Sequence, residues 1–244
     1  MGIWEQSDYD VRLEWGGEGV AVLGRECAVL IIVDVLSFST TTDIVLGRGG
    51  RVLPVRWRDE RAVLYARESG AVITGERGFT LRPSSVTEIP SGTLLALPSP
   101  NGATLCDAAA ETGSEVMAGC LRNASAVAAK AHELAKGEPI GVIPAGERWG
   151  VNIFGAGDTF GPLRPCVEDL IGAGTIAAAL AAFGRSLSPE AQQAAHPIEA
   201  ADVLAGCTSG RELVEAGHGR DVELAAQVDV SDVAPVLIEG VLTG

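Results

Sequence analysis

The sequence feature that most constrains the fold is an uninterrupted apolar run at residues 28–35, AVLIIVDV. A run this short and this rich in β-branched residues favours a strand that is buried on both faces of a sheet. Such strands occur mainly in parallel sheets that helices cover from both sides. We therefore expect residues 28–35 to form the central strand of an α/β fold.

The chain continues with short apolar segments that alternate with helical ones. This rhythm predicts right-handed crossovers and a three-layer α/β/α fold with a mostly parallel sheet. The predicted strands are 51–55, 71–74, 93–98, 115–119 and 140–145, and the predicted helices between them are 37–47, 58–69, 101–112 and 122–136.

The C-terminal third has a different character, because longer helical patterns replace the alternation. We expect helices at 167–183, 189–206 and 211–226, followed by a last strand at 233–238. Near the other end, YDVRLEW at 9–15 alternates apolar and polar residues, which predicts an exposed edge strand. With no linker or repeat in between, residues 1–244 are interpreted as a single α/β domain.

The charge and apolar content exclude several partners and locations. A formal net charge of -14 disfavours nucleic acid, whose binding requires clustered Lys and Arg. The longest apolar run, 171–183, is too short to cross a bilayer. An acidic start and five cysteines without a CxxC pair favour a cytoplasmic protein with reduced thiols. The sequence is also compatible with a homo-oligomer.

Polar residues follow five of the predicted strands, those at 28–35, 71–74, 93–98, 115–119 and 140–145. In open α/β sheets, ligands bind beyond the carboxyl ends of the strands, so we expect these side chains to share one rim. They comprise Asp34, Ser37, Ser39, Thr40 and Thr41 after the first strand, Glu76 and Arg77, then Ser99, Asn101 and Gly102, then Cys120, Arg122 and Asn123, and finally Gly146, Glu147 and Arg148.

Helix starts rich in hydroxyl residues are a second feature, at Ser39, Ser99 and Thr208. A helix amino terminus offers free N–H groups and the positive end of a dipole, so it can hold an anion in an acidic protein. The alternative is ordinary helix capping, for which the same residue types are preferred.

Several carboxylates fall on or near the expected rim and could supply the hard oxygen ligands that Mg²⁺ prefers. No HExxH motif or Cys/His cluster indicates zinc. The alternative for a lone acid after a strand is a helix cap or a salt bridge. The candidate ligands are Asp34, Glu76, Glu147, Glu168 and Asp169.

Six stretches taken together resemble the 2-phosphosulfolactate phosphatase family. They occur in the order of that family and cover most of the chain, at 33–42 (VDVLSFSTTT), 75–78 (GERG), 99–105 (SPNGATL), 118–128, 167–174 and 209–230. The resemblance implies Mg²⁺-dependent removal of phosphate from 2-phospho-3-sulfolactate, a small anionic substrate, leaving 3-sulfolactate.

The resemblance also implies roles for individual residues. Asp34, Glu76, Glu168 and Asp169 are the predicted catalytic residues, which hold the metal or its activated water, and Glu147 is a further metal ligand. A covalent intermediate on Asp34 or on a cysteine is the alternative to attack by water. The predicted substrate-binding residues are Ser39, Thr40, Thr41, Asn101 and Gly102 for phosphate, Arg77, Arg122 and Arg211 for the other anionic groups, and Asn123 and Ser209.

Two departures from the family pattern bear on the substrate. Many members have VDVLRAT where this chain has VDVLSFS, so Ser37 replaces an anion-contacting arginine. The stretch 148–165 is longer than the usual loop and is interpreted as a lid or a tolerated insertion. The rival functions are therefore a metal-dependent phosphatase of another small phosphorylated acid and a non-catalytic anion-binding protein of the same fold.

Overall fold

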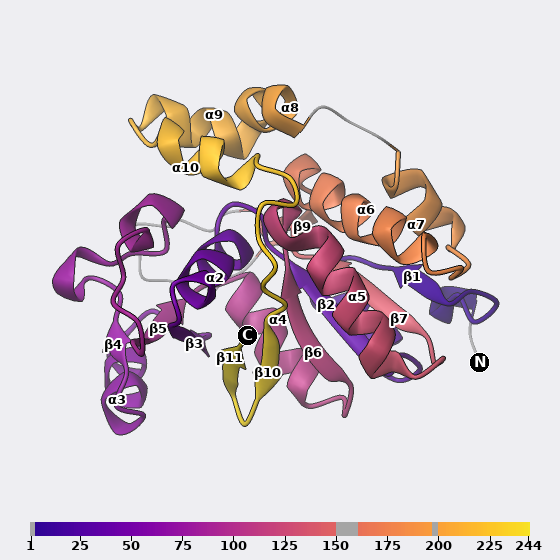
Figure 1. Ribbon diagram of the computed structural model, residues 1–244, viewed down its shortest axis with the longest axis horizontal. Helices are drawn as coiled ribbons and strands as arrows, with labels where there is room; N and C mark the ends of the chain where they lie inside the picture. Colours follow the sequence, from indigo (N-terminus) through magenta and orange to yellow (C-terminus); the bar gives the residue numbers. More distant parts are fainter. Residues whose placement is uncertain (1–2, 150–160, 197–199) are drawn as a thin grey trace.

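The computed structural model describes residues 3–149, 161–196 and 200–244, and in these ranges it contains one large mixed sheet (Figure 1). The strand order is β1-β7-β2-β6-β10-β11-β3-β5-β4. The bounds are β1 Val11–Leu13, β2 Val29–Val33, β3 Arg51–Val55, β4 Val72–Ile73, β5 Leu94–Pro98, β6 Glu115–Gly119, β7 Ile140–Pro144, β10 Val236–Ile238 and β11 Val241–Thr243.

Strand β2 has the predicted central place, because it pairs in parallel with β7 on one side and β6 on the other. Leu30 and Ile32 pack in one core with residues of α1 (Gly16–Leu23) and α4 (Gly102–Ala110). Val29, Ile31 and Val33 pack in a second core with α5 (Ala124–Ala135) and α6 (Val167–Ala181). Alternate side chains of one strand thus feed two cores, and the predicted α/β/α layering is confirmed.

The C-terminal hairpin was not predicted. The expected last strand at 233–238 contains β10, but a second strand, β11, follows it in antiparallel pairing, and the two are inserted between the parallel strands β6 and β3. Glu239 and Gly240, which join them, both have positive φ, the pattern of a two-residue hairpin turn. Glu-Gly is a weak turn signal compared with Asn-Gly, which explains why the sequence did not reveal it.

Helix α2 (Phe38–Gly47) is buried from Phe38 to Leu46. It contacts both β3 and β6, the strands that flank the hairpin, and therefore lies between the two parallel parts of the sheet (Figure 1). A helix that is apolar or small-polar all round needs such an enclosed position.

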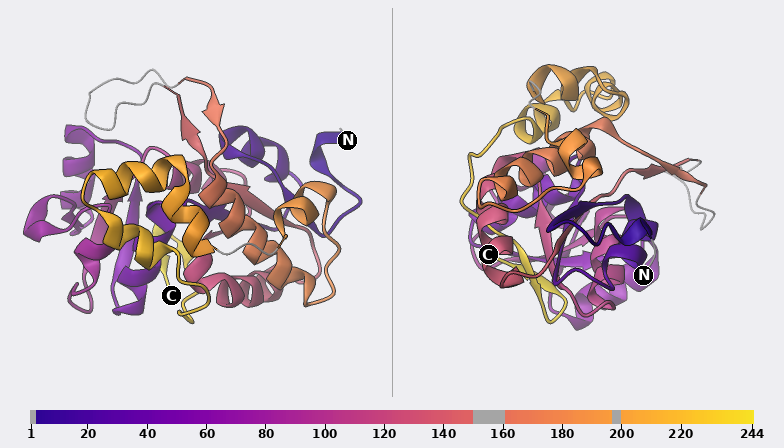
Figure 2. Two further views of the ribbon diagram at one scale, coloured as in Figure 1. Left: turned by 90° about the horizontal axis from the view of Figure 1, so that it is seen from above. Right: turned by 90° about the vertical axis from the view of Figure 1, so that its right-hand side faces the viewer.

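The C-terminal helices are shorter than predicted. Instead of two helices at 189–206 and 211–226, there are α7 (Pro189–Ala194), α8 (Ala200–Gly206), α9 (Thr208–Glu215) and α10 (Gly219–Ala225). Gly217, with φ +83°, separates α9 from α10 because a left-handed residue cannot continue a helix. Helices α8 to α10 form a layer beyond the carboxyl ends of the parallel strands, not on a sheet face (Figures 1 and 2).

The predicted edge strand at 9–15 contains β1, which is at the sheet edge but is not exposed. Val11 and Leu13 are buried, and so is Arg12, whose guanidinium donates to the carbonyls of Tyr9 and Glu5. These backbone carbonyls accept the hydrogen bonds of the buried guanidinium. A polar residue in the strand was therefore not a sign of solvent exposure, and the prediction of an exposed strand was wrong. Within the described ranges, no helix combines the length and apolar character needed to cross a bilayer.

Candidate active site

A pocket of about 160 Å³ lies where β2, β5 and β7 end, and we call it the Asp34 pocket. Because parallel strands present their carboxyl ends at one edge, residues far apart in the sequence meet here. Its lining residues are Asp34, Leu36, Ser37, Arg58, Leu81, Ser99, Pro100, Asn101, Glu147, Arg148 and Glu212.

Asp34 is the most buried charged group of this pocket, with 5% of its surface exposed. Its Oδ2 accepts hydrogen bonds from the Gly102 N–H at 2.8 Å and from the Ser99 hydroxyl at 3.3 Å. Its Oδ1 accepts only a long one, from the Phe38 N–H at 3.4 Å. No arginine or lysine of the described ranges forms an ion pair with it. Two helix-start N–H groups and one hydroxyl stabilise the charge, and Oδ1 can accept further hydrogen bonds or bind a cation.

Gly102 is required by this close approach. A Cβ at residue 102 would lie 2.8 Å from the Asp34 Oδ2 and 2.4 Å from the Phe38 ring. Only glycine therefore allows the first turn of α4 to donate its N–H to Asp34. The predicted substrate-binding Gly102 thus donates to a carboxylate in this structure.

The pocket carries uncompensated negative charge. Burial raises the pKa of Asp34 to about 6, and the nearby Glu147 charge adds to the increase. Burial also raises the pKa of Asp169, with the charges of Asp34 and Glu168 contributing. Because burial and neighbouring acidic charges raise the pKa values of Asp34 and Asp169, this part of the site favours binding of a cation or a proton.

Asp169 lies in the first turn of α6 and connects two of the strand ends. Its Oδ1 accepts the Val35 N–H and its Oδ2 accepts the Gly146 N–H, both at 2.8 Å. The neighbouring Glu168 is buried beside the Cys207 thiol. This geometry favours Asp169 as an anchor for the loop that carries Asp34, and the metal-binding roles of both acids stay predictions.

Glu147 reaches the pocket from a small antiparallel pair, β8 (Glu147–Arg148) and β9 (Leu163–Arg164). Arg164 donates to Glu147 at 2.8 Å and to the Ser209 hydroxyl at 3.2 Å. The predicted Ser209 is therefore linked to the pocket through Arg164. Most of the predicted lid, residues 150–160, lies outside the described residues.

The hydroxyl groups predicted to bind phosphate are buried and engaged with the backbone. Ser39 accepts from the Asp34 N–H at 3.0 Å. Thr40 donates to the Val35 carbonyl at 2.8 Å and Thr41 to the Leu81 carbonyl at 2.6 Å. They hold α2 in place, while Ser99 and Asn101 line the pocket itself. Phosphate binding by the three hydroxyls remains a prediction.

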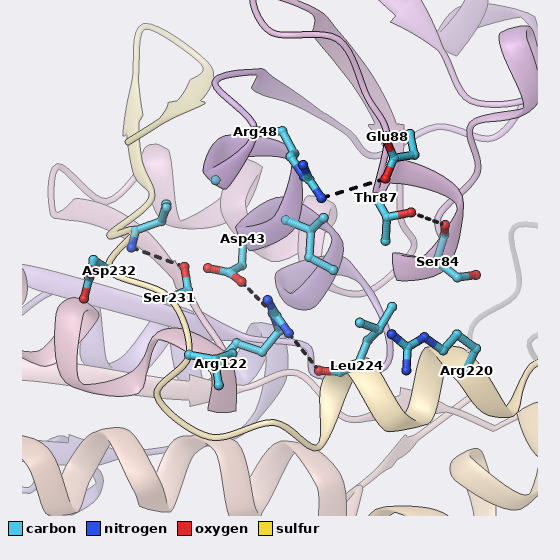
Figure 3. A pocket seen from close by; sticks show the side chains of 14 residues that line it. Asp43, Arg48, Ser84, Thr87, Glu88, Arg122, Arg220, Leu224, Ser231 and Asp232 are labelled. Carbon is cyan, nitrogen blue, oxygen red and sulfur yellow. Dashed lines mark hydrogen bonds and ion pairs between the residues drawn. The ribbon is translucent and has the colours of Figure 1, made fainter.

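Arg122 lies at a different pocket, of about 680 Å³ (Figure 3). Its Nε donates to the Asp43 Oδ2 at 2.7 Å, and its Nη1 donates to the Leu224 carbonyl at 3.2 Å. The adjacent Asn123 is buried and accepts the Cys120 N–H at 2.9 Å. Both predicted substrate contacts are thus engaged inside the protein.

The remaining predicted residues are exposed. Arg211 pairs with Glu215 one turn along α9, at 3.2 Å. Glu76 and Arg77 belong to the short 3₁₀ helix η2 (Glu76–Gly78) and line neither pocket. The structure therefore does not bring these residues to Asp34, and their roles stay predictions.

Two charged residues of the pocket were missed. Arg58 follows β3, so the strand-end rule would have found it, but the sequence assigned it to a helix that begins only at Glu60. Glu212 comes from α9, and no local pattern predicts that this helix lies over the carboxyl edge.

Comparison with known proteins identifies the family. The chain matches the sequence model of the 2-phosphosulpholactate phosphatase family over residues 22–240. It is 28% identical to the "Probable 2-phosphosulfolactate phosphatase" of Deinococcus radiodurans, over 87% of this chain and 88% of that protein. It is 27% identical to the 2-phosphosulfolactate phosphatase of Methanothermobacter thermautotrophicus, over 86% and 87%. The chain therefore belongs to the 2-phosphosulfolactate phosphatase family, whose members are phosphoric monoester hydrolases.

Proposed function

We propose that this chain hydrolyses the phosphate ester of 2-phospho-3-sulfolactate, giving 3-sulfolactate and phosphate. The observation that carries the proposal is Asp34, a buried carboxylate with no cationic partner among the described residues that opens into a pocket at the carboxyl edge. Membership of the family supports the reaction and the substrate. A small phosphorylated acid also matches a pocket of about 160 Å³.

The few carboxylates at this pocket suit Mg²⁺, which keeps several water ligands, better than a metal ion that is held by protein ligands alone. Among the described residues, no three His, Cys, Asp or Glu side chains converge as a metal cage. Mg²⁺ is commonly bound by one or two carboxylates, with waters and substrate phosphate completing its shell. Asp34 and Glu147, which follow β2 and β7, would supply these carboxylates. When bound, Mg²⁺ would neutralise charge on the transferring phosphoryl group.

The chain's own groups then bind and orient the substrate. The Asn101 side-chain amide lines the pocket beside the start of α4, where neutral donors and the helix dipole suit a phosphate group. The backbone N–H of Gly102 and the Ser99 hydroxyl hold the Asp34 carboxylate at its Oδ2. The orientation of Oδ1, which would bind the metal ion, is thereby fixed. Asp169 keeps the two flanking loops together.

One observation favours a second candidate function. Ser37 lines the pocket at the position where many family members have arginine, so the pocket lacks one cation of the usual set. The second candidate is therefore hydrolysis of a phosphorylated acid other than 2-phospho-3-sulfolactate.

A phosphate-release assay of the purified protein tests these proposals. The substrates are 2-phospho-3-sulfolactate, 2-phosphoglycolate, 3-phosphoglycerate and p-nitrophenyl phosphate, each with Mg²⁺ and with EDTA. We expect the highest kcat/KM for 2-phospho-3-sulfolactate, loss of turnover in EDTA and recovery with Mg²⁺. A higher kcat/KM for another acid would favour the second candidate. No release from any ester would indicate a non-catalytic protein, and full activity without metal would contradict the Mg²⁺ proposal.

A further inference from the structure

Three arginines flank Trp57 after β3, and Arg58 differs from the other two. Arg56 forms an ion pair with Asp107 at 2.8 Å, and Arg61 forms one with Asp59 at 2.6 Å. Arg58 makes no hydrogen bond or ion pair with any residue in the described ranges, yet it lines the Asp34 pocket. It therefore has a full set of guanidinium donors directed to no protein acceptor.

The pocket's other arginine is already engaged. Arg148 donates to both carboxylate oxygens of Glu18, at 2.8 and 3.2 Å. Of the cationic side chains that line the Asp34 pocket, Arg58 is therefore the one whose charge remains for a ligand. Arg58 is exposed at the mouth of the pocket, and partial desolvation lowers the pKa of its guanidinium. An anion that enters the pocket could accept hydrogen bonds from the free guanidinium.

Stacking on Trp57 does not explain the position of Arg58. The guanidinium carbons of Arg56 and Arg61 lie 4.8 and 5.8 Å from the centre of the indole ring, and these two residues provide the cation–π contacts. Arg56 and Arg61 therefore make the structural contacts at this surface. Arg58 can be changed without breaking an ion pair or a ring contact described here.

The substrate class proposed above has a second anionic group besides the phosphate. We infer that Arg58 is a specificity-determining residue that binds this non-reacting carboxylate or sulfonate. The inference rests on the proposed function. A guanidinium fork matches the paired oxygens of a carboxylate or sulfonate, and Ser37 contributes no charge at the same pocket. The acids Asp34 and Glu147, which line the same pocket, would repel a second anion.

The test compares Arg58→Met with Arg56→Met, a matched control that removes a neighbouring guanidinium outside the pocket. Methionine keeps much of the apolar stem. For each variant, kcat/KM is measured for the preferred phosphorylated acid and for p-nitrophenyl phosphate, which has no second anionic group. We expect Arg58→Met to lower kcat/KM for the acid by about tenfold to a hundredfold, with little change for p-nitrophenyl phosphate. Arg56→Met should change neither value.

Two results would overturn the inference: an equal loss on both substrates, or no loss on either, by Arg58→Met. If the wild-type protein hydrolyses none of the esters, the proposed function fails, and calorimetric titration with 3-sulfolactate then decides the role of Arg58. Binding that weakens at least about tenfold in Arg58→Met, and not in Arg56→Met, would support the anion contact. Equal affinity of both proteins, or no binding by the wild type, would contradict it.

Discussion

Asp34 and Asp43 are two buried aspartates at the ends of the same short segment, one just before α2 and one within it. They are 5% and 1% exposed, but their charges are compensated differently. Asp43 faces Arg122, whose Nε lies 2.7 Å from its Oδ2 (Figure 3). Asp34 has only N–H and hydroxyl donors.

We interpret Asp43 as a structural carboxylate and Asp34 as the proposed functional one. Asp43 has a cationic partner, because Arg122 pairs with its Oδ2 and joins α2 to the segment after β6, although its Oδ1 is buried without a hydrogen bond. At Asp34 the cost of burying a charge is not offset by a cation, so a metal ion, a substrate complex or a proton is favoured there. A buried acid without a partner is thus the better indicator of the active site.

The largest effect on stability should come from breaking the Asp43–Arg122 pair. Arg122→Met leaves Asp43 buried without its cation, which we expect to cost about 3 kcal/mol of unfolding free energy. In a chain of 244 residues this corresponds to a fall in Tm of roughly 6 to 12 °C. Differential scanning calorimetry measures it. Turnover at temperatures well below Tm should change far less.

The double variant Asp43→Asn with Arg122→Met is the control. Because it removes both charges, it should be more stable than Arg122→Met alone, and the double-mutant cycle gives the coupling energy. An unchanged Tm in Arg122→Met together with a large loss of kcat/KM would instead support the substrate-binding role predicted from the sequence.

A smaller effect should appear in the pH dependence of stability. The folded-state pKa of Asp34 is raised to about 6 by burial, from a value near 4 in the unfolded chain. The native state therefore binds the proton more tightly, and stability from this group falls as pH rises from about 4 to 6. Relative to wild type in EDTA, Asp34→Asn should gain on the order of 2 kcal/mol between pH 4 and pH 7.

Urea unfolding at several pH values gives this difference. Asp43→Asn is the comparison, because it also removes a buried acid but leaves Arg122 without its partner charge. Burial also raises the pKa of Asp43, but the hydrogen bonds from Ser231 and Arg122 lower it, so the stability of Asp43→Asn relative to wild type should rise less with pH. A pH-independent difference between Asp34→Asn and wild type would contradict the raised pKa of Asp34.

The smallest effect should come from Arg211, whose pair with Glu215 is exposed on α9. Arg211→Met should change the unfolding free energy by less than about 0.5 kcal/mol, because solvent screens such pairs. Tm and kcat/KM together test it. If Tm is unchanged but kcat/KM falls more than about tenfold, Arg211 has the substrate role that the sequence predicted.

Local patterns predicted the parallel part of the fold well. The strand at 51–55 matches β3, and the run at 28–35 contains β2, because buried strands have dense apolar sequences. The hairpin of β10 and β11 was missed because its neighbours, such as Met117 opposite Val236, are remote in sequence. No local signal specifies such a pairing.

Only part of the site was predicted, because contacts between segments remote in sequence also shape it. The strand-end rule correctly placed Asp34, Asn101 and Glu147 at one pocket. The rule gives the edge of the sheet but not the position of α2, which lies between the two parallel parts of the sheet and bonds to Arg122 through Asp43. Arg122 follows a strand like the others, yet the structure places it at a different pocket.

The most direct test of the central claim is phosphate release by Asp34→Asn and Asp43→Asn, measured at saturating Mg²⁺ beside their melting curves. Asparagine at position 34 can still accept the Gly102 N–H, so the protein should fold with a Tm equal to or above that of wild type at pH 7. Loss of the charge should lower kcat by about a hundredfold, or ~3 kcal/mol. Asp43→Asn should lose stability and keep most of its turnover. A folded Asp34→Asn protein with near wild-type turnover would contradict the account.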